Sequence, residues 1–189
     1  MIRIQPSAFI LMAALMLLLP IDWLFAAVLA AAVHELGHLA AIHAVGGHLD
    51  VICIGSAGAQ ICTEPLDNRA EFLCAAAGPA ASLFLLSLCR FFPKTALCGL
   101  VQGMFNLIPV HPMDGGRMLL CVLRRLCPRW AERIFHTIQC LILYGLLTLS
   151  VLLAVCGKAG FLPVLACITV LSRLLLSKIP CKSAGFAVQ

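Results

Sequence analysis

The chain has 189 residues, of which 62% are hydrophobic and only 11% are charged. An average soluble protein carries about 25% charged residues. The 13 basic and 8 acidic side chains are too few to cover a soluble globule of this length. These numbers exclude a soluble enzyme, a nucleic-acid-binding domain and a disordered chain. They predict one domain, residues 1–189, embedded in the lipid bilayer of the cell membrane.

About six apolar stretches approach the length of roughly 20 residues that a helix needs to cross the hydrocarbon. In chain order they cover residues 4–19, 23–45, 70–92, 95–108, 134–156 and 161–176. We interpret the first as an uncleaved signal anchor, because no small-x-small cleavage site follows the basic Arg3. The expected fold is therefore an all-α, multi-pass membrane protein with about six transmembrane helices.

The polar interval 46–69 has a pattern of its own. Residues 51–54 are strand-like, 55–58 favour a turn, and 59–62 can form a returning strand. We expect a small β-hairpin over residues 48–62 at the membrane surface. An unstructured cytoplasmic loop is the alternative.

The distribution of Lys and Arg predicts the orientation, because cytoplasmic loops carry an excess of basic residues. A cytoplasmic N-terminus leaves only Arg90, Lys94 and Lys158 outside. The inner side then holds Arg3, Arg69, Arg117, Arg124, Arg125, Arg129, Arg133, Arg173, Lys178 and Lys182. Both termini are accordingly predicted to be cytoplasmic.

Glu35 is the one acidic residue in the middle of a predicted span, where a charged group by default marks function. It belongs to His34-Glu35-Leu36-Gly37-His38, an H-E-x-x-H pattern. Two histidines four residues apart on a helix lie on one face, one turn apart, so both imidazoles can reach one ion. Glu35 lies close enough to act on a water molecule there. The pattern predicts a Zn²⁺ site with Glu35 as the catalytic base; a structural His-Glu pair that joins two helices is the alternative.

A catalytic zinc usually has three protein ligands, so a third must come from elsewhere in the chain. Asp114 is the strongest candidate, because it follows Pro109 and Pro112 in an irregular segment, and irregular backbone at membrane depth is buried or lines a wet cavity. An ordinary cytoplasmic turn is the alternative for this segment. His43 faces away from His34 and His48 lies beyond the helix end, whereas geometry alone does not exclude His136.

The two motifs together resemble those of the site-2 protease family of intramembrane zinc metalloproteases. The first is His34-Glu35-Leu36-Gly37-His38, and the second is Asn106-x-x-Pro109-x-x-Pro112-x-Asp114-Gly115. The resemblance implies a catalytic core at about residues 23–116, with zinc held by His34, His38 and Asp114. It also implies that Glu35 activates water and that Asn106 holds substrate backbone or orients the loop.

The span pattern is similar to that of the sporulation-type branch, represented by stage IV sporulation protein FB. That branch usually carries a cytoplasmic CBS domain, whereas here neither a CBS nor a PDZ domain is expected. This chain also departs from the family's Gly-Pro-x-x-Asn element, because Ser82 occupies the Asn position after Gly78-Pro79. Regulation is then expected to come from partner membrane proteins or from substrate availability, in regulated intramembrane proteolysis connected with sporulation.

The expected substrates are membrane-associated or single-span proteins, cleaved within or near the membrane with access from the cytoplasm. The alternative is a proteolytically inactive metal-binding membrane protein or a transporter, although no convincing internal repeat supports a transporter. A serine protease would need a G-x-S-x-G-like site and an aspartyl protease two intramembrane Asp residues, and the sequence offers neither.

Overall fold

The computed structural model describes residues 2–4, 6–55, 58–63 and 66–155. The chain divides into two compact units, residues 1–142 and 143–189. All elements but the second half of the last helix belong to the first unit. The helices are α1 (Pro6–Leu18), α2 (Ile21–Ala44), α3 (Asn68–Phe84), α4 (Pro93–Asn106), α5 (Asp114–Leu126) and α6 (Ala131–Val155), and the strands are β1 (Ile2–Ile4), β2 (Leu49–Gly55) and β3 (Gly58–Thr63).

Three helical segments in the described part of the chain are long and apolar enough to cross a membrane. They cover Ile21–Ala44, Asn68–Leu88 and Ala131–Leu153, and they correspond to the second, third and fifth predicted spans. Many large apolar side chains on these helices are exposed, such as Phe25 and Leu36 on α2, as lipid-facing surfaces require. These features indicate a membrane protein.

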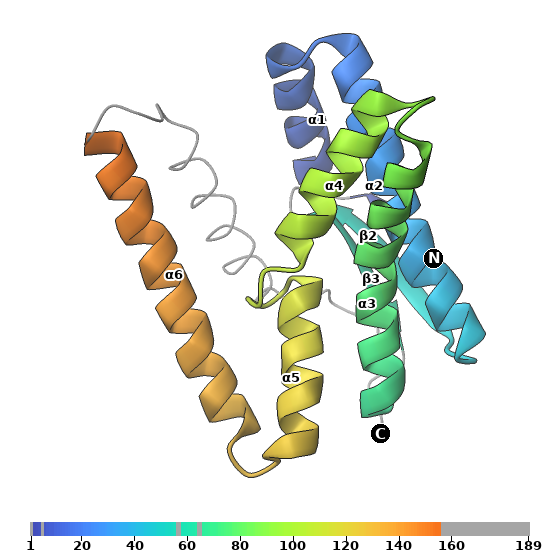
Figure 1. The fold of residues 1–189 in the computed structure, drawn as a ribbon. Coiled ribbons are helices and arrows are strands. Elements are labelled where there is room, and N and C mark those ends of the chain that lie inside the picture. Colours follow the sequence, from blue (N-terminus) through green and yellow to red (C-terminus); the bar gives the residue numbers. More distant parts are fainter. Residues whose placement is uncertain (1, 5, 56–57, 64–65, 156–189) are drawn as a thin grey trace. The chain divides into compact units, whose positions relative to one another are not determined.

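The other three predicted spans have different outcomes. The first stretch forms a helix of only 13 residues, Pro6–Leu18, which reaches roughly 20 Å, short of the hydrocarbon thickness of about 30 Å. The fourth forms the 14-residue α4, which the α4–α5 loop separates from α5 (Figure 1). The sixth, at residues 161–176, lies outside the described residues. Six transmembrane helices therefore remain a prediction.

The segment expected to form a hairpin contains the antiparallel pair β2–β3, with Ile52 opposite Ile61 and Ile54 opposite Ala59. The sequence pattern did not indicate a third strand, β1, which pairs with β2 in parallel. The order is β1-β2-β3, so β2 is the central strand and β3 lies at an edge of the sheet. The position of this sheet at the membrane surface is still a prediction.

Helices α2, α3 and α4 pack on one another, and α5 packs against α3. Local signals define their starts: the side chain of Asp67 accepts a hydrogen bond from Ala70 N at 2.7 Å at the beginning of α3, and Pro93 is the first residue of α4. Gly37 on α2 allows close packing, because a Cβ there would lie 2.6 Å from the carbonyl oxygen of Ala77 on α3. This packing encloses the predicted site residues.

Candidate metal centre

Helix α2 supplies both predicted histidine ligands. His34 and His38 are buried, with 2% and 7% of their surface exposed. Their rings meet edge to face with centroids 4.8 Å apart, and the two Nε2 atoms are 3.2 Å apart. The i, i+4 spacing therefore brings both imidazoles together, as the helical period predicts.

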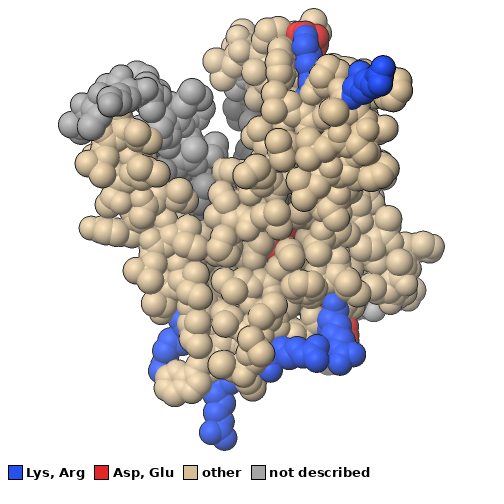
Figure 2. Space-filling view, viewed as in Figure 1, with Lys and Arg blue, Asp and Glu red and all other residues tan. Residues whose placement is uncertain are grey.

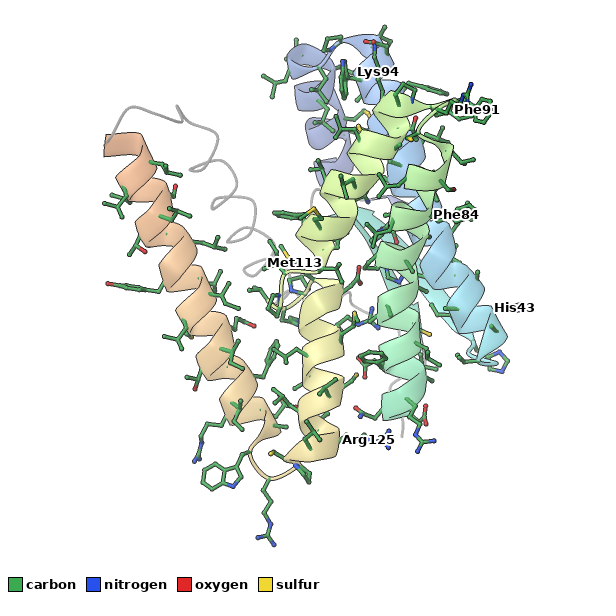
Figure 3. The ribbon with its side chains drawn as sticks, viewed as in Figure 1. His43, Phe84, Phe91, Lys94, Met113 and Arg125 are labelled. Atoms are coloured by element: carbon green, nitrogen blue, oxygen red, sulfur yellow. The ribbon has the colours of Figure 1, made fainter. Side chains whose placement is uncertain are left out.

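Asp114 joins them from the first turn of α5. Its Oδ2 lies 3.1 Å from Nε2 of His34 and 3.3 Å from Nε2 of His38. Gly115 permits this placement, because a Cβ there would lie 2.0 Å from the carbonyl oxygen of Leu107. The α4–α5 loop can thus fold tightly against α5, and Figure 3 shows Met113 at this bend. Among the described residues, His34, His38 and Asp114 form the one group of three that could hold a metal ion.

Helix α3 orients the far side of both rings. Nδ1 of His38 donates to the carbonyl oxygen of Cys74 at 2.7 Å, because a carbonyl can only accept. Nδ1 of His34 lies 2.8 Å from Oγ of the fully buried Ser82. Gly78 provides the space for His38, since a Cβ there would lie 2.2 Å from its Nε2. Such outer contacts fix the ring orientation of metal-binding histidines.

These hydrogen bonds also decide which atoms face the centre of the site. A neutral His38 that donates through Nδ1 has a lone pair on Nε2. The Nδ2 group of Asn106 donates to Nε2 of His34 at 3.0 Å, so this nitrogen is likewise an acceptor. Two acceptor nitrogens and the carboxylate of Asp114 therefore converge in a buried space. A cation there would take the lone pair of His34 in place of the Asn106 hydrogen bond and would offset the repulsion between the acceptors.

The spacing of the three atoms fits a zinc ion. Ligands about 2.0 Å from the centre of a tetrahedron are about 3.3 Å from one another. The observed separations of 3.1, 3.2 and 3.3 Å match the edges of one face of such a tetrahedron. The donor set of two imidazoles and one carboxylate also suits zinc. The residues present therefore fit a metal ion with a fourth position free for another ligand.

The structure separates the remaining predicted residues into near and distant ones. Asn106 is buried beside His34, and the half-buried Glu35 follows His34 on α2. His43 and His48 are exposed. His136 is also exposed, with Nδ1 3.4 Å from the sulfur of Cys140, and it does not join the cluster.

Sequence reasoning missed the contributions of α3. Ser82 drew notice only as a departure from a family element, and its hydrogen bond to His34 was not foreseen. The Gly78-Pro79 pair was the available signal that this part of α3 approaches the site. The carbonyl of Cys74 had no signal, because any residue supplies a backbone carbonyl.

Three comparisons with known proteins each found a similarity to this chain. The family model of peptidase family M50 matches residues 75–149, a segment that includes Asn106 and Asp114. A zinc metalloprotease of Methanocaldococcus jannaschii is 29% identical over 140 residues, which are 64% of this chain and 41% of that protein. The chain is thus similar to members of peptidase family M50 over residues 75–149.

A solved site-2 protease from Methanocaldococcus jannaschii has a similar fold, with a TM-score of 0.68 and 21% identity. The alignment covers all of this chain and 93% of that one. The solved structure shows that this chain shares its fold, and the described part of the fold includes the His-His-Asp cluster that could hold a metal ion. The chain spans less than half the length of the zinc metalloprotease.

Proposed function

We propose that the protein is an intramembrane zinc metalloprotease that hydrolyses peptide bonds of membrane-associated or single-span proteins. The observation that carries the proposal is the convergence of three buried metal-ligating atoms, from His34, His38 and Asp114, at the spacing of a tetrahedral face. The adjacent Glu35 provides the carboxylate that a hydrolase needs in addition to the ligands.

His34, His38 and Asp114 would hold the zinc ion, with Ser82 and the Cys74 carbonyl fixing the two rings. When bound, Zn²⁺ supplies positive charge that polarises a carbonyl oxygen and makes a nearby water molecule more acidic. The imidazoles and the carboxylate remain ligands and transfer no proton.

Glu35 is the proposed general base and acid. It takes a proton from water as the water oxygen attacks the scissile carbonyl carbon, and it then gives this proton to the leaving amine nitrogen as the C–N bond breaks. The proposed role of Asn106 is to donate a hydrogen bond to substrate backbone or to hold the loop in position, and its Nδ2, 3.0 Å from Nε2 of His34, supports this role.

The edge of the small sheet is the proposed binding site for an extended substrate, which would add to it as a strand. The order of the strands decides which residues can test this role. Ile54 lies in the central strand, so a proline there would break the sheet itself, whereas Gln60 and Ile61 lie in β3. Successive N–H groups of an edge strand point to opposite sides. One of the variants Gln60→Pro and Ile61→Pro should therefore lose cleavage while the β1–β2 pairing is retained; full cleavage by both would exclude this role.

We also propose cytoplasmic access to the site, cytoplasmic termini and a place in the sporulation-type branch. The orientation rests on the distribution of basic residues, and the branch rests on the resemblance of the span pattern. A membrane-tethered transcription-factor precursor is a substrate that suits this branch. A comparison of membrane proteomes with and without the chain would identify the substrates.

The proteolytic function is tested with purified full-length protein in bilayers and a model single-span substrate. We expect cleavage that a chelator abolishes and zinc restores. Glu35→Gln should bind one zinc ion per chain and cleave nothing, whereas the matched variant Glu132→Gln, at an exposed position, should cleave normally. Cleavage by Glu35→Gln would refute the role of Glu35. Zinc binding without cleavage by the parent would favour the alternative, a metal-binding protein that is not a protease.

A further inference from the structure

Basic side chains gather at the end of the molecule where α5 ends and α6 begins. Figure 2 shows this group at the lower end of the view, and Figure 3 marks it with Arg125. We define the basic end as the arginines near the start of α3, on α5 and around the α5–α6 turn. They are Arg69, Arg117, Arg124, Arg125, Arg129 and Arg133.

Two of these arginines have acidic partners. Glu71 lies 3.7 Å from Arg117 and 3.8 Å from Arg124. Arg124 also donates to Glu132 at 2.8 Å, and this hydrogen bond raises the pKa of the guanidinium further. Among the described residues, no ion pair involves the other four arginines of the basic end, which are all exposed. The basic end therefore carries positive charge that the described carboxylates do not neutralise.

The adjoining apolar residues fix the level of this charge in the membrane. The apolar segment of α6 begins at Ala131, directly after Trp130. Trp130 and Leu126 are 55% and 71% exposed, and the guanidinium of Arg133 lies 4.9 Å from the centre of the Trp130 ring. Tryptophan is enriched where the hydrocarbon meets the headgroups. Arg125, Arg129 and Arg133 therefore lie at headgroup level.

We propose that the basic end is a binding site for anionic phospholipids, in which Arg125, Arg129 and Arg133 hold the headgroup phosphate and Trp130 and Leu126 contact the upper acyl chains. Arginine pairs with phosphate through charge-assisted and often bidentate hydrogen bonds. Basic residues near a membrane surface each contribute about 1 kcal/mol of attraction to anionic lipid. The inference does not depend on proteolysis.

The opposite end of the helices provides an internal contrast. There Lys94 lies 5.5 Å from the centre of the Trp23 ring, which is also a cation beside a tryptophan. Lys94, however, forms an ion pair with Asp22, so its charge is neutralised. Figure 3 shows Lys94 and Arg125 at opposite ends. Exposed Arg90 lies in the same connection before α4, so that end keeps one cation without an ion pair among the described residues. The two tryptophans of the chain therefore lie beside an unpaired cation at Trp130 and a paired one at Trp23.

The experiment uses the full chain as two single-tryptophan variants, Trp23→Phe and Trp130→Phe, each in phosphatidylcholine bilayers. A fraction of the lipid is replaced by brominated phosphatidylglycerol or, in parallel, by brominated phosphatidylcholine, because bromine quenches tryptophan fluorescence on contact. We expect a relative binding constant at Trp130 that favours phosphatidylglycerol by about fivefold or more, which corresponds to one contribution of about 1 kcal/mol. At Trp23 we expect a smaller preference, because the cation beside that ring is paired with Asp22.

Two further measurements assign the preference to the arginines. The changes Arg125→Gln and Arg129→Gln, made together in the Trp23→Phe protein, should remove the preference for phosphatidylglycerol at Trp130. They leave the contact of Arg133 with the Trp130 ring in place. High salt should weaken the preference. Equal quenching by both lipids at Trp130 would overturn the proposal, as would an equal anionic preference at Trp23 or a preference that survives the double arginine change.

Discussion

The close approach of the His38 ring to Gly78 predicts a large effect of one methyl group added at that glycine. In Gly78→Ala the new Cβ would lie 2.2 Å from Nε2, 2.4 Å from Cε1 and 2.8 Å from Cδ2 of His38. Ordinary contact begins at about 3.4 Å, so the imidazole must retreat by roughly 1.2 Å. Zinc–nitrogen bonds are about 2.0 Å long and tolerate about ±0.2 Å. A ring displaced that far could not ligate an ion that His34 and Asp114 would hold.

The expected result is a zinc affinity at least about 100-fold lower, the upper end of the cost of disturbing an outer contact. Competition with a chromophoric chelator on metal-free protein measures it without any cleavage assay. The control is Gly145→Ala, because a Cβ at Gly145 has no heavy atom within 4 Å. Thermal unfolding of the metal-free proteins separates general overpacking, which costs roughly 1–3 kcal/mol, from loss of the site. A Gly78→Ala protein that binds zinc as tightly as the parent would refute the reasoning.

Three other changes test neighbouring parts of the account. Ser82→Ala removes the partner of His34 Nδ1 and should weaken zinc binding about 10- to 100-fold. The control Ser87→Ala removes only an exposed hydrogen bond to a backbone carbonyl and should leave zinc binding unchanged. Equal zinc affinities of the two variants would show that Ser82 does not orient His34. Asp114→Asn removes the one anionic ligand and should lower zinc stoichiometry and cleavage together, so unchanged values would require another third ligand. In sealed right-side-out vesicles an impermeant thiol reagent should label the exposed Cys89 but not the exposed Cys127. Peptide mass spectrometry identifies the labelled cysteine. Labelling of Cys127 alone would mean that the orientation is the reverse of the proposed one.

The local part of the metal centre could be predicted because a helix has a fixed period. A spacing of four positions from His34 to His38 places both imidazoles on one face, whatever surrounds them. The approach of Asp114, 80 positions along the chain from His34, depends on tertiary packing, and only its proline- and glycine-rich surroundings pointed to it. The contacts of Ser82 and Cys74 depend on the exact rotation of α3 against α2, which no pattern in one sequence specifies.

The same distinction applies to the fold. Long apolar stretches predicted the helices at Ile21–Ala44 and Ala131–Leu153 to within a few residues, since length and composition determine them. Strand β1 could not be predicted, because its pairing with β2 joins residues about 50 positions apart and depends on no local signal. Residues Ile2–Ile4 belong to that strand, so the helix in the first predicted span begins at Pro6.

The most direct test of the central claim is X-ray absorption at the zinc edge of purified protein loaded with one equivalent of zinc. We predict one bound ion per chain, with nitrogen and oxygen neighbours near 2.0 Å and the multiple-scattering pattern of two imidazoles. The chain contains 11 cysteines, so zinc bound elsewhere would show sulfur near 2.3 Å. A sulfur shell, a single imidazole, or the same spectrum from a His34→Ala, His38→Ala double variant would contradict the proposed centre.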